Sequence, residues 1–112
     1  MAETEEGIHI CDAAVTLAFS VLGKRWNGMI IATLGTEPAT FAALRRSVTG
    51  ISDTVLSDRL TELAQAGLVA RSVEAGPPVS VSYELSASGR ELLPILEQLG
   101  TWASANLSTS AH

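Results

Sequence analysis

The chain has 112 residues and a formal net charge of −5, and this length predicts a single domain. No apolar run approaches the roughly 20 residues that a membrane-spanning helix needs, and the acidic first residues lack the positive charge of a secretory signal. A single cysteine excludes an internal disulfide framework. We therefore expect a cytoplasmic protein that is not associated with a membrane.

The charge is unevenly distributed along the chain. An overall excess of acid opposes nucleic-acid binding, because contacts to phosphates dominate the affinity. From Lys24 to Arg71, however, six basic residues stand against four acidic ones, which is a local balance of +2. The surface field can therefore differ in sign from the net charge, and DNA binding is not excluded.

The first third of the chain predicts an arm followed by two helices. Residues 1–10 are expected to form a flexible N-terminal arm. Asp12 is a suitable N-cap, and the apolar residues that follow it at helical spacing predict a helix over 12–22. A second helix is predicted over 24–34, and Gly35 marks the turn after it.

Two further helices are predicted in the middle of the chain. Thr40 caps a short helix over 41–48, and Ser52 caps a helix over 52–66 that Gly67 ends. The inward stripe of this last helix consists of leucines at spacings of four and three, namely Leu56, Leu60 and Leu63.

Beyond Gly67 the pattern changes from helical to alternating. Two β-rich segments, 68–73 and 79–85, flank a Gly-Pro-Pro turn and predict a β-hairpin. A last helix, capped by Ser86 or Ser88, is predicted to end at about residue 107.

The order of these elements predicts the fold. Four helices, two strands and a final helix follow the plan of a winged helix-turn-helix, in which the second helix of the pair enters the major groove of DNA. The fold class is mainly α with a small β-hairpin (α+β). The DNA-binding and dimerisation domain is expected to span 11–107, and the tail over 108–112 is expected to be disordered.

Several motifs occur here in the order typical of one known family. They are Cys11, LGKRW at 22–26, FAALRRSVTGISDTVLSDRLTELAQAGLV at 41–69, GPPVSVSYELSASGRELLPIL at 76–96, and Trp102. On these motifs the chain resembles the HxlR-type transcriptional regulators, which are winged-helix relatives of the MarR group. The resemblance covers about residues 11–105.

The resemblance implies a homodimer in which extra terminal helices of the two protomers form the interface. Each protomer then offers one recognition helix to a double-stranded operator, and the protein regulates transcription, usually as a repressor. Some members of the family sense oxidants or electrophiles through a cysteine near the N-terminus. No cofactor is expected.

The outward face of the helix over 52–66 is the predicted DNA-reading surface. Hydroxyl groups and arginine contact phosphates and base edges, and an aspartate can accept a hydrogen bond from cytosine N4. The residues predicted to face DNA are Ser52, Thr54, Ser57, Asp58 and Arg59. The alternative is a solvated helix face, in which Asp53 serves only the helix dipole.

Four basic residues are predicted to contact the DNA backbone. Arg45 and Arg46 lie on the helix that crosses the backbone before the turn. Lys24 and Arg25 open the helix over 24–34, where cations oppose the helix dipole, so a phosphate contact would explain their position better than stability does. The alternative in each case is ordinary surface charge.

The predicted wing departs from the family pattern. Relatives often carry an arginine near its tip, where this chain has Ser80, and the run over 79–82 has no charge. Ser80 is kept as a DNA-contact candidate. Because a missing phosphate contact lowers affinity, we expect weaker binding to DNA than in typical relatives.

Cys11 is the candidate sensor of oxidants or electrophiles. It is placed just before the predicted first helix, where the dipole favours a thiolate, although Asp12 and the upstream glutamates oppose this. With no second cysteine, Cys11 would react with the partner's Cys11, with a small thiol or directly with an alkylating agent. The alternative is a small buried residue at the dimer interface.

Other chemistry is less well supported by the sequence. Phe19, Trp26 and Trp102 are predicted to lie in the core or the dimer interface, or to line a pocket for a small apolar effector. His9 and Cys11 are too few ligands for a metal site. No catalytic motif is present, so we do not expect an enzyme.

The sequence thus predicts a sequence-specific, DNA-binding transcriptional regulator that acts as a homodimer. It is expected to repress, and to respond to an oxidant, an electrophile or a small apolar effector. The alternative is a winged-helix module that binds another protein through its acidic surface and uncharged wing, with weak or no DNA binding.

Overall fold

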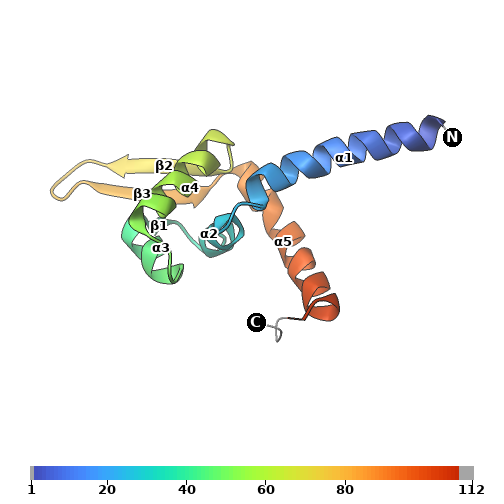
Figure 1. Ribbon diagram of the computed structural model, residues 1–112. Coiled ribbons are helices and arrows are strands. Elements are labelled where there is room, and N and C mark those ends of the chain that lie inside the picture. Colours follow the sequence, from blue (N-terminus) through green and yellow to red (C-terminus); the bar gives the residue numbers. More distant parts are fainter. Residues whose placement is uncertain (1, 109–112) are drawn as a thin grey trace.

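The computed structural model describes residues 2–108, and the side chains of residues 12–108. The end of the tail predicted to be disordered, 109–112, lies outside the described residues. In chain order the elements are α1 (Ala2–Leu22), α2 (Asn27–Leu34), β1 (Ala39–Thr40), α3 (Phe41–Ser47), α4 (Asp53–Gln65), β2 (Val69–Glu74), β3 (Ser80–Leu85) and α5 (Ala87–Asn106). The mainly helical winged helix-turn-helix fold predicted from the sequence is confirmed (Figure 1).

The body of the molecule consists of α2, α3 and α4 packed with a small antiparallel sheet, whose strand order is β1-β3-β2. The long hairpin of β2 and β3 forms the wing, which extends from one end of the body (Figure 1). Helices α1 and α5 project away from the body at the other end. None of the helices in the described part of the chain is long and apolar enough to cross a bilayer.

The hydrophobic core lies between the three helices of the body and the sheet. The fully buried apolar side chains are Ile30, Ile31 and Leu34 of α2, Leu44 and Val48 around the end of α3, and Leu56, Leu60 and Leu63 of α4. The leucine stripe predicted for α4 is therefore confirmed. Burying each such side chain contributes about 1.5–3 kcal/mol, so this stripe fixes which face of α4 points outward.

Local hydrogen bonds set the helix boundaries that the sequence predicts. The Thr40 and Ser52 hydroxyls accept from the backbone N–H groups of Ala43 (3.1 Å) and Val55 (3.2 Å). These bonds confirm the predicted N-caps of α3 and α4. Gly67 has φ +80°, the left-handed conformation expected of the residue that ends a helix.

Helices α1 and α2 begin elsewhere than predicted. Helix α1 extends back to Ala2, so the start predicted at Asp12 is wrong. The arm expected over 1–10 contains good helix formers such as alanine and glutamate, and the helix continues through them. Helix α2 begins at Asn27 rather than Lys24, because Trp26 adopts a left-handed backbone conformation (φ +82°) that a helix cannot contain.

Strand β1 was not expected. Its two residues pair with the wing, Ala39 opposite Tyr83 and Thr40 opposite Ser82. A strand of two residues is too short to show an alternating pattern, and only the pairing with β3 defines it. This strand ties the start of α3 to the base of the wing.

The contact between α5 and the body depends on Gly89. This residue is buried in the first turn of α5, and an added Cβ would overlap the carbonyl oxygen of Leu68. The same oxygen accepts from the Ser86 backbone N–H at 2.9 Å, so it has no room to move. Gly100, further along α5, has open space in the position of a Cβ.

These two glycines of one helix give a matched pair of variants. We expect Gly89→Ala to lower the free energy of unfolding by more than about 2 kcal/mol through overpacking. Gly100→Ala should raise it by about 0.5–1 kcal/mol, because alanine is the better helix former. Urea unfolding followed by circular dichroism measures both values, and equal effects of the two changes would contradict the packing described here.

Candidate nucleic-acid interface

The outward face of α4 is exposed and rich in hydroxyl groups. Because the leucine stripe faces the core, Ser52, Thr54, Ser57 and Asp58 are exposed to solvent, as predicted. Within the described part of the chain, the side chains of Thr54, Ser57 and Asp58 have no hydrogen-bond or ion-pair partner. The Ser52 oxygen caps the helix. This face therefore presents unused donors and acceptors to a ligand.

Arg45 is held by an ion pair across the helix-turn-helix. Its Nε lies 2.7 Å from Oδ1 of Asp53, in the first turn of α4, and both side chains are exposed. Asp53 therefore has a role beyond the helix dipole, which sequence reasoning missed because it depends on the angle between α3 and α4. Arg46 is also exposed and has no ion-pair partner among the described residues.

Lys24 and Arg59 meet at one carboxylate on the flank of α4. Oε1 of Glu62 lies 3.1 Å from Lys24 Nζ and 2.8 Å from Arg59 Nη1. Arg59 is only 22% exposed, so it lies against the flank of the helix rather than on its outward face. Sequence reasoning missed Glu62, although its position three residues after Arg59 is a typical spacing for an ion pair on a helix.

Arg25 stacks on its neighbour, with its guanidinium carbon 4.6 Å from the ring centroid of Trp26. Lys24 and Arg25 lie in the turn before α2, so the prediction that they open that helix is wrong, and the argument from its dipole does not apply. Together with Arg59 they surround a hollow of about 350 Å³ beside α4.

The wing contributes little positive charge. Ser80 is half-buried at the start of β3, where it pairs with Glu74 of β2. Arg71 lies further back on β2, opposite Tyr83. The residue opposite Ser80 is therefore acidic, and it does not replace the arginine that relatives often carry at this position of the wing.

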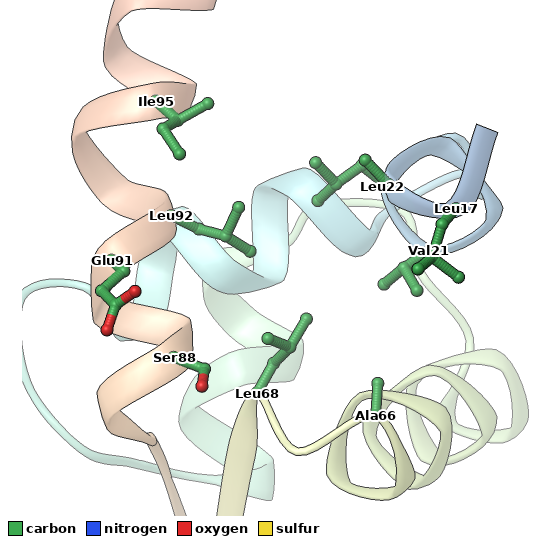
Figure 2. A pocket seen from close by; sticks show the side chains of 10 residues that line it. Leu17, Val21, Leu22, Ala66, Leu68, Ser88, Glu91, Leu92 and Ile95 are labelled. Atoms are coloured by element: carbon green, nitrogen blue, oxygen red, sulfur yellow. The ribbon is translucent and has the colours of Figure 1, made fainter. Parts of the chain in front are cut away.

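The structure does not bring the three candidate aromatic residues into one pocket. Phe19 and Trp102 are each about half exposed on α1 and α5, whereas Trp26 packs against the core. A larger apolar hollow, of about 510 Å³, lies instead between α1, the α4–β2 turn and α5 (Figure 2). Its lining is formed by Leu17, Ala18, Val21, Leu22, Ala66, Leu68, Ser88, Glu91, Leu92 and Ile95.

A family model for HxlR-like helix-turn-helix proteins matches residues 21–111. The chain belongs to the HxlR family. It is 41% identical over 86 residues to the HTH-type transcriptional regulator YodB of Bacillus subtilis (strain 168), with 77% of each chain covered.

Solved structures of two regulators share the fold. The reduced form of YodB from B. subtilis has a TM-score of 0.77 at 38% identity, covering 83% of this chain and 91% of that one. The redox regulator HypR in its reduced form has a TM-score of 0.78 at 31% identity, covering 83% and 92%. This HxlR protein is accordingly a helix-turn-helix transcriptional regulator of a DNA-binding family, and not an enzyme.

Cys11 of this HxlR protein lies well inside α1, not just before its first turn. Because the influence of the helix dipole falls off within one turn, the sequence argument that placed this thiol in the field of the helix N-terminus does not apply. The structure does not describe the side chains of Cys11 and His9, and His112 lies outside the described residues.

The Arg45–Asp53 ion pair predicts an unusual gain of function in this HxlR protein. Asp53→Asn should release Arg45 for a phosphate and raise the slope of log K against log[salt] by about 0.9 in magnitude. DNA binding should therefore tighten at low salt, while the free energy of unfolding falls by no more than about 1 kcal/mol. Fluorescence anisotropy over a salt series measures the slope.

The control is Asp12→Asn, which changes the net charge equally but lies on α1. Weaker binding by Asp53→Asn, or the same small effect in both variants, would show that Asp53 does not restrain Arg45.

Proposed function

We propose that this protein is a homodimeric repressor that binds a double-stranded operator through the exposed face of α4. The observation that carries the proposal is the orientation of α4. Its leucine stripe is buried, while its opposite face is exposed and carries Thr54, Ser57 and Asp58, whose side chains have no partner among the described residues. Basic residues flank this face on two sides, with Arg45 and Arg46 on α3 and with Lys24 and Arg25 in the turn before α2. This arrangement suits contacts with the phosphates that border a major groove.

Exposed apolar side chains on the projecting helices support the homodimer. Leu17 and Phe19 of α1 are 70% and 52% exposed, and Ile95 and Trp102 of α5 are 55% and 53% exposed. Large apolar side chains exposed on two helices that project from the body are typical of a protein interface. A two-fold interface would cover the same patch on both protomers, and the hollow between α1 and α5 opens beside it.

A dimer provides the operator geometry. Two α4 helices held about one helical turn of DNA apart, roughly 34 Å, reach successive major grooves on one side of the duplex. A change at the interface of α1 and α5 alters this spacing. An effector that acts there would therefore release the operator without touching α4.

The proposed function is tested with the DNA upstream of the protein's own gene. We expect two chains per duplex by light scattering, tighter binding than to random DNA, and a steep loss of affinity between 50 and 200 mM salt, as counterion release requires. Absence of binding even at low salt would contradict the proposal and favour a winged-helix module that binds another protein.

The second part of the proposal is that Cys11 makes the repressor responsive to electrophiles. YodB has been solved in diamide-treated and quinone-bound forms, and HypR is described as a redox regulator in reduced and oxidised forms. In this chain Cys11 is the only cysteine. Its thiolate would add to a ring carbon of a quinone, and the proton of the thiol would end on the quinone oxygen. Cys11 lies in α1, one of the two helices at the proposed interface.

Operator release by a quinone distinguishes a sensing role of Cys11 from a purely structural one. We expect the unmodified protein to lose operator binding when treated with benzoquinone, and Cys11→Ser to keep it, because serine is not nucleophilic under these conditions. Gel-shift titration, with the adduct verified by mass spectrometry, measures both. Equal release by the two proteins would leave Cys11 as a structural residue only.

A further inference from the structure

The hollow beside α4 gathers an unusual share of the positive charge of the molecule. It is lined by Lys24, Arg25, Trp26, Val55 and Arg59 and has a volume of about 350 Å³. Three of the seven basic residues of the chain therefore surround one small space, although the net charge is −5. The three cations come from two separate elements, the turn after α1 and the helix α4.

The turn that carries Lys24 and Arg25 is firmly fixed. Asn27 is completely buried, and its Nδ2 donates to the carbonyl oxygen of Val21 at 2.7 Å, which closes the turn from inside. Trp26 has a positive φ, which is rare for a bulky residue and is found where surrounding structure enforces it. Its ring packs against the core and supports the Arg25 guanidinium. The cations are therefore held in place before any ligand arrives.

Arg59 has hydrogen-bonding capacity that the protein does not use. Its Nη1 donates to Glu62, but its buried Nε has no hydrogen-bond partner among the described residues. A buried donor without a partner is costly and is uncommon in folded proteins. A guanidinium presents several donors in one plane, and these match the oxygens of a phosphate.

Glu62 leaves the hollow with an excess of positive charge. A single carboxylate oxygen accepts from both Lys24 and Arg59, and Arg25 adds a third cation. The single negative charge of Glu62 thus orders two cations, and the three cations together keep a net positive charge. The carboxylate keeps Lys24 and Arg59 side by side, at a spacing that an anion with several oxygens can bridge.

We propose that this hollow is a phosphate-binding site, built from Lys24, Arg25 and Arg59 and ordered by Glu62. The proposal rests on the proposed function in one respect, because the phosphate that it takes is one of the DNA backbone beside the groove that α4 enters. A phosphate group of a small molecule has the same chemistry and would occupy the same place. The site joins the turn after α1 to α4, so its occupancy couples a proposed interface helix to the DNA-reading helix.

The test compares two variants of the hollow, Lys24→Ala and Arg25→Ala, with Arg90→Ala, which removes the same charge from an exposed position on α5. We expect each variant of the hollow to weaken operator and random DNA alike and to reduce the salt slope by about 0.9, the value for one phosphate contact. Arg90→Ala should leave the slope unchanged. Circular dichroism confirms that each variant is folded.

A second arm uses inorganic phosphate with the intact protein, at constant ionic strength, and follows the indole N–H signal of Trp26 by NMR. A saturable shift that Lys24→Ala abolishes supports the site and shows that free phosphate also enters it. A shift with DNA alone supports the site and assigns it to the backbone.

The two arms separate the failure of this proposal from failure of the proposed function. One outcome overturns the phosphate site but leaves the proposed repressor intact. In it, the protein binds its operator, Lys24→Ala and Arg90→Ala have the same salt slope, and the Trp26 signal responds neither to DNA nor to inorganic phosphate. If DNA is not bound at all while phosphate still shifts Trp26, the site stands and the DNA-binding function is overturned.

Discussion

The burial of Leu56, Leu60 and Leu63 against the core is the contact on which the rest of the structure depends. These three side chains set the rotation of α4 about its own axis. A helix has one inward stripe, so fixing it also fixes the opposite face, which carries Thr54, Ser57 and Asp58 here. Slippage of this stripe by one residue would turn α4 by about 100° and take the hydroxyl-bearing face away from the surface.

The acidic character of the chain is consistent with DNA binding because of where the acids lie. Asp53 and Glu62, two of the four acids between Lys24 and Arg71, are paired with the cations around α4. Paired carboxylates reduce the local positive charge, but they also hold flexible side chains in defined places. Exposed pairs contribute little to stability, so their main effect is on order and on affinity. DNA must compete with these carboxylates, which favours modest affinity and a smaller dependence on salt than the same cations would give if they were unpaired.

The sequence predicted those features that rest on local pattern. The capping serine, the leucine spacing and the final glycine of α4 act over a few residues, and so the helix was found with its correct face. The hairpin was found from alternation and its Gly-Pro-Pro turn. The start of α2 was misplaced because the left-handed Trp26 depends on the buried Asn27 and on packing against the core. Helix α1 reaches Ala2, although the local capping signal at Asp12 predicts a later start.

The site was predicted less completely than the fold. The residue types on α4 indicated a DNA-reading face. They did not show that Arg45 and Lys24, which lie on other elements, form ion pairs with acidic residues of α4. Such pairs depend on helix packing angles that no local pattern encodes. Arg59 shows the same limit, since it was predicted to face DNA and its side chain is only 22% exposed in the structure. The hollow beside α4 became visible only when the turn after α1 was placed next to that helix.

The central claim is that α4 and the turn over 23–26 form one DNA-binding surface on a dimer. Amide chemical-shift mapping by NMR tests it most directly, with a duplex of the DNA upstream of the protein's own gene added at low salt. We expect the largest changes at Ser52, along the outward face of α4 and in the turn over 23–26. Changes confined to α1 and α5, or the absence of any change at low salt, would contradict the account.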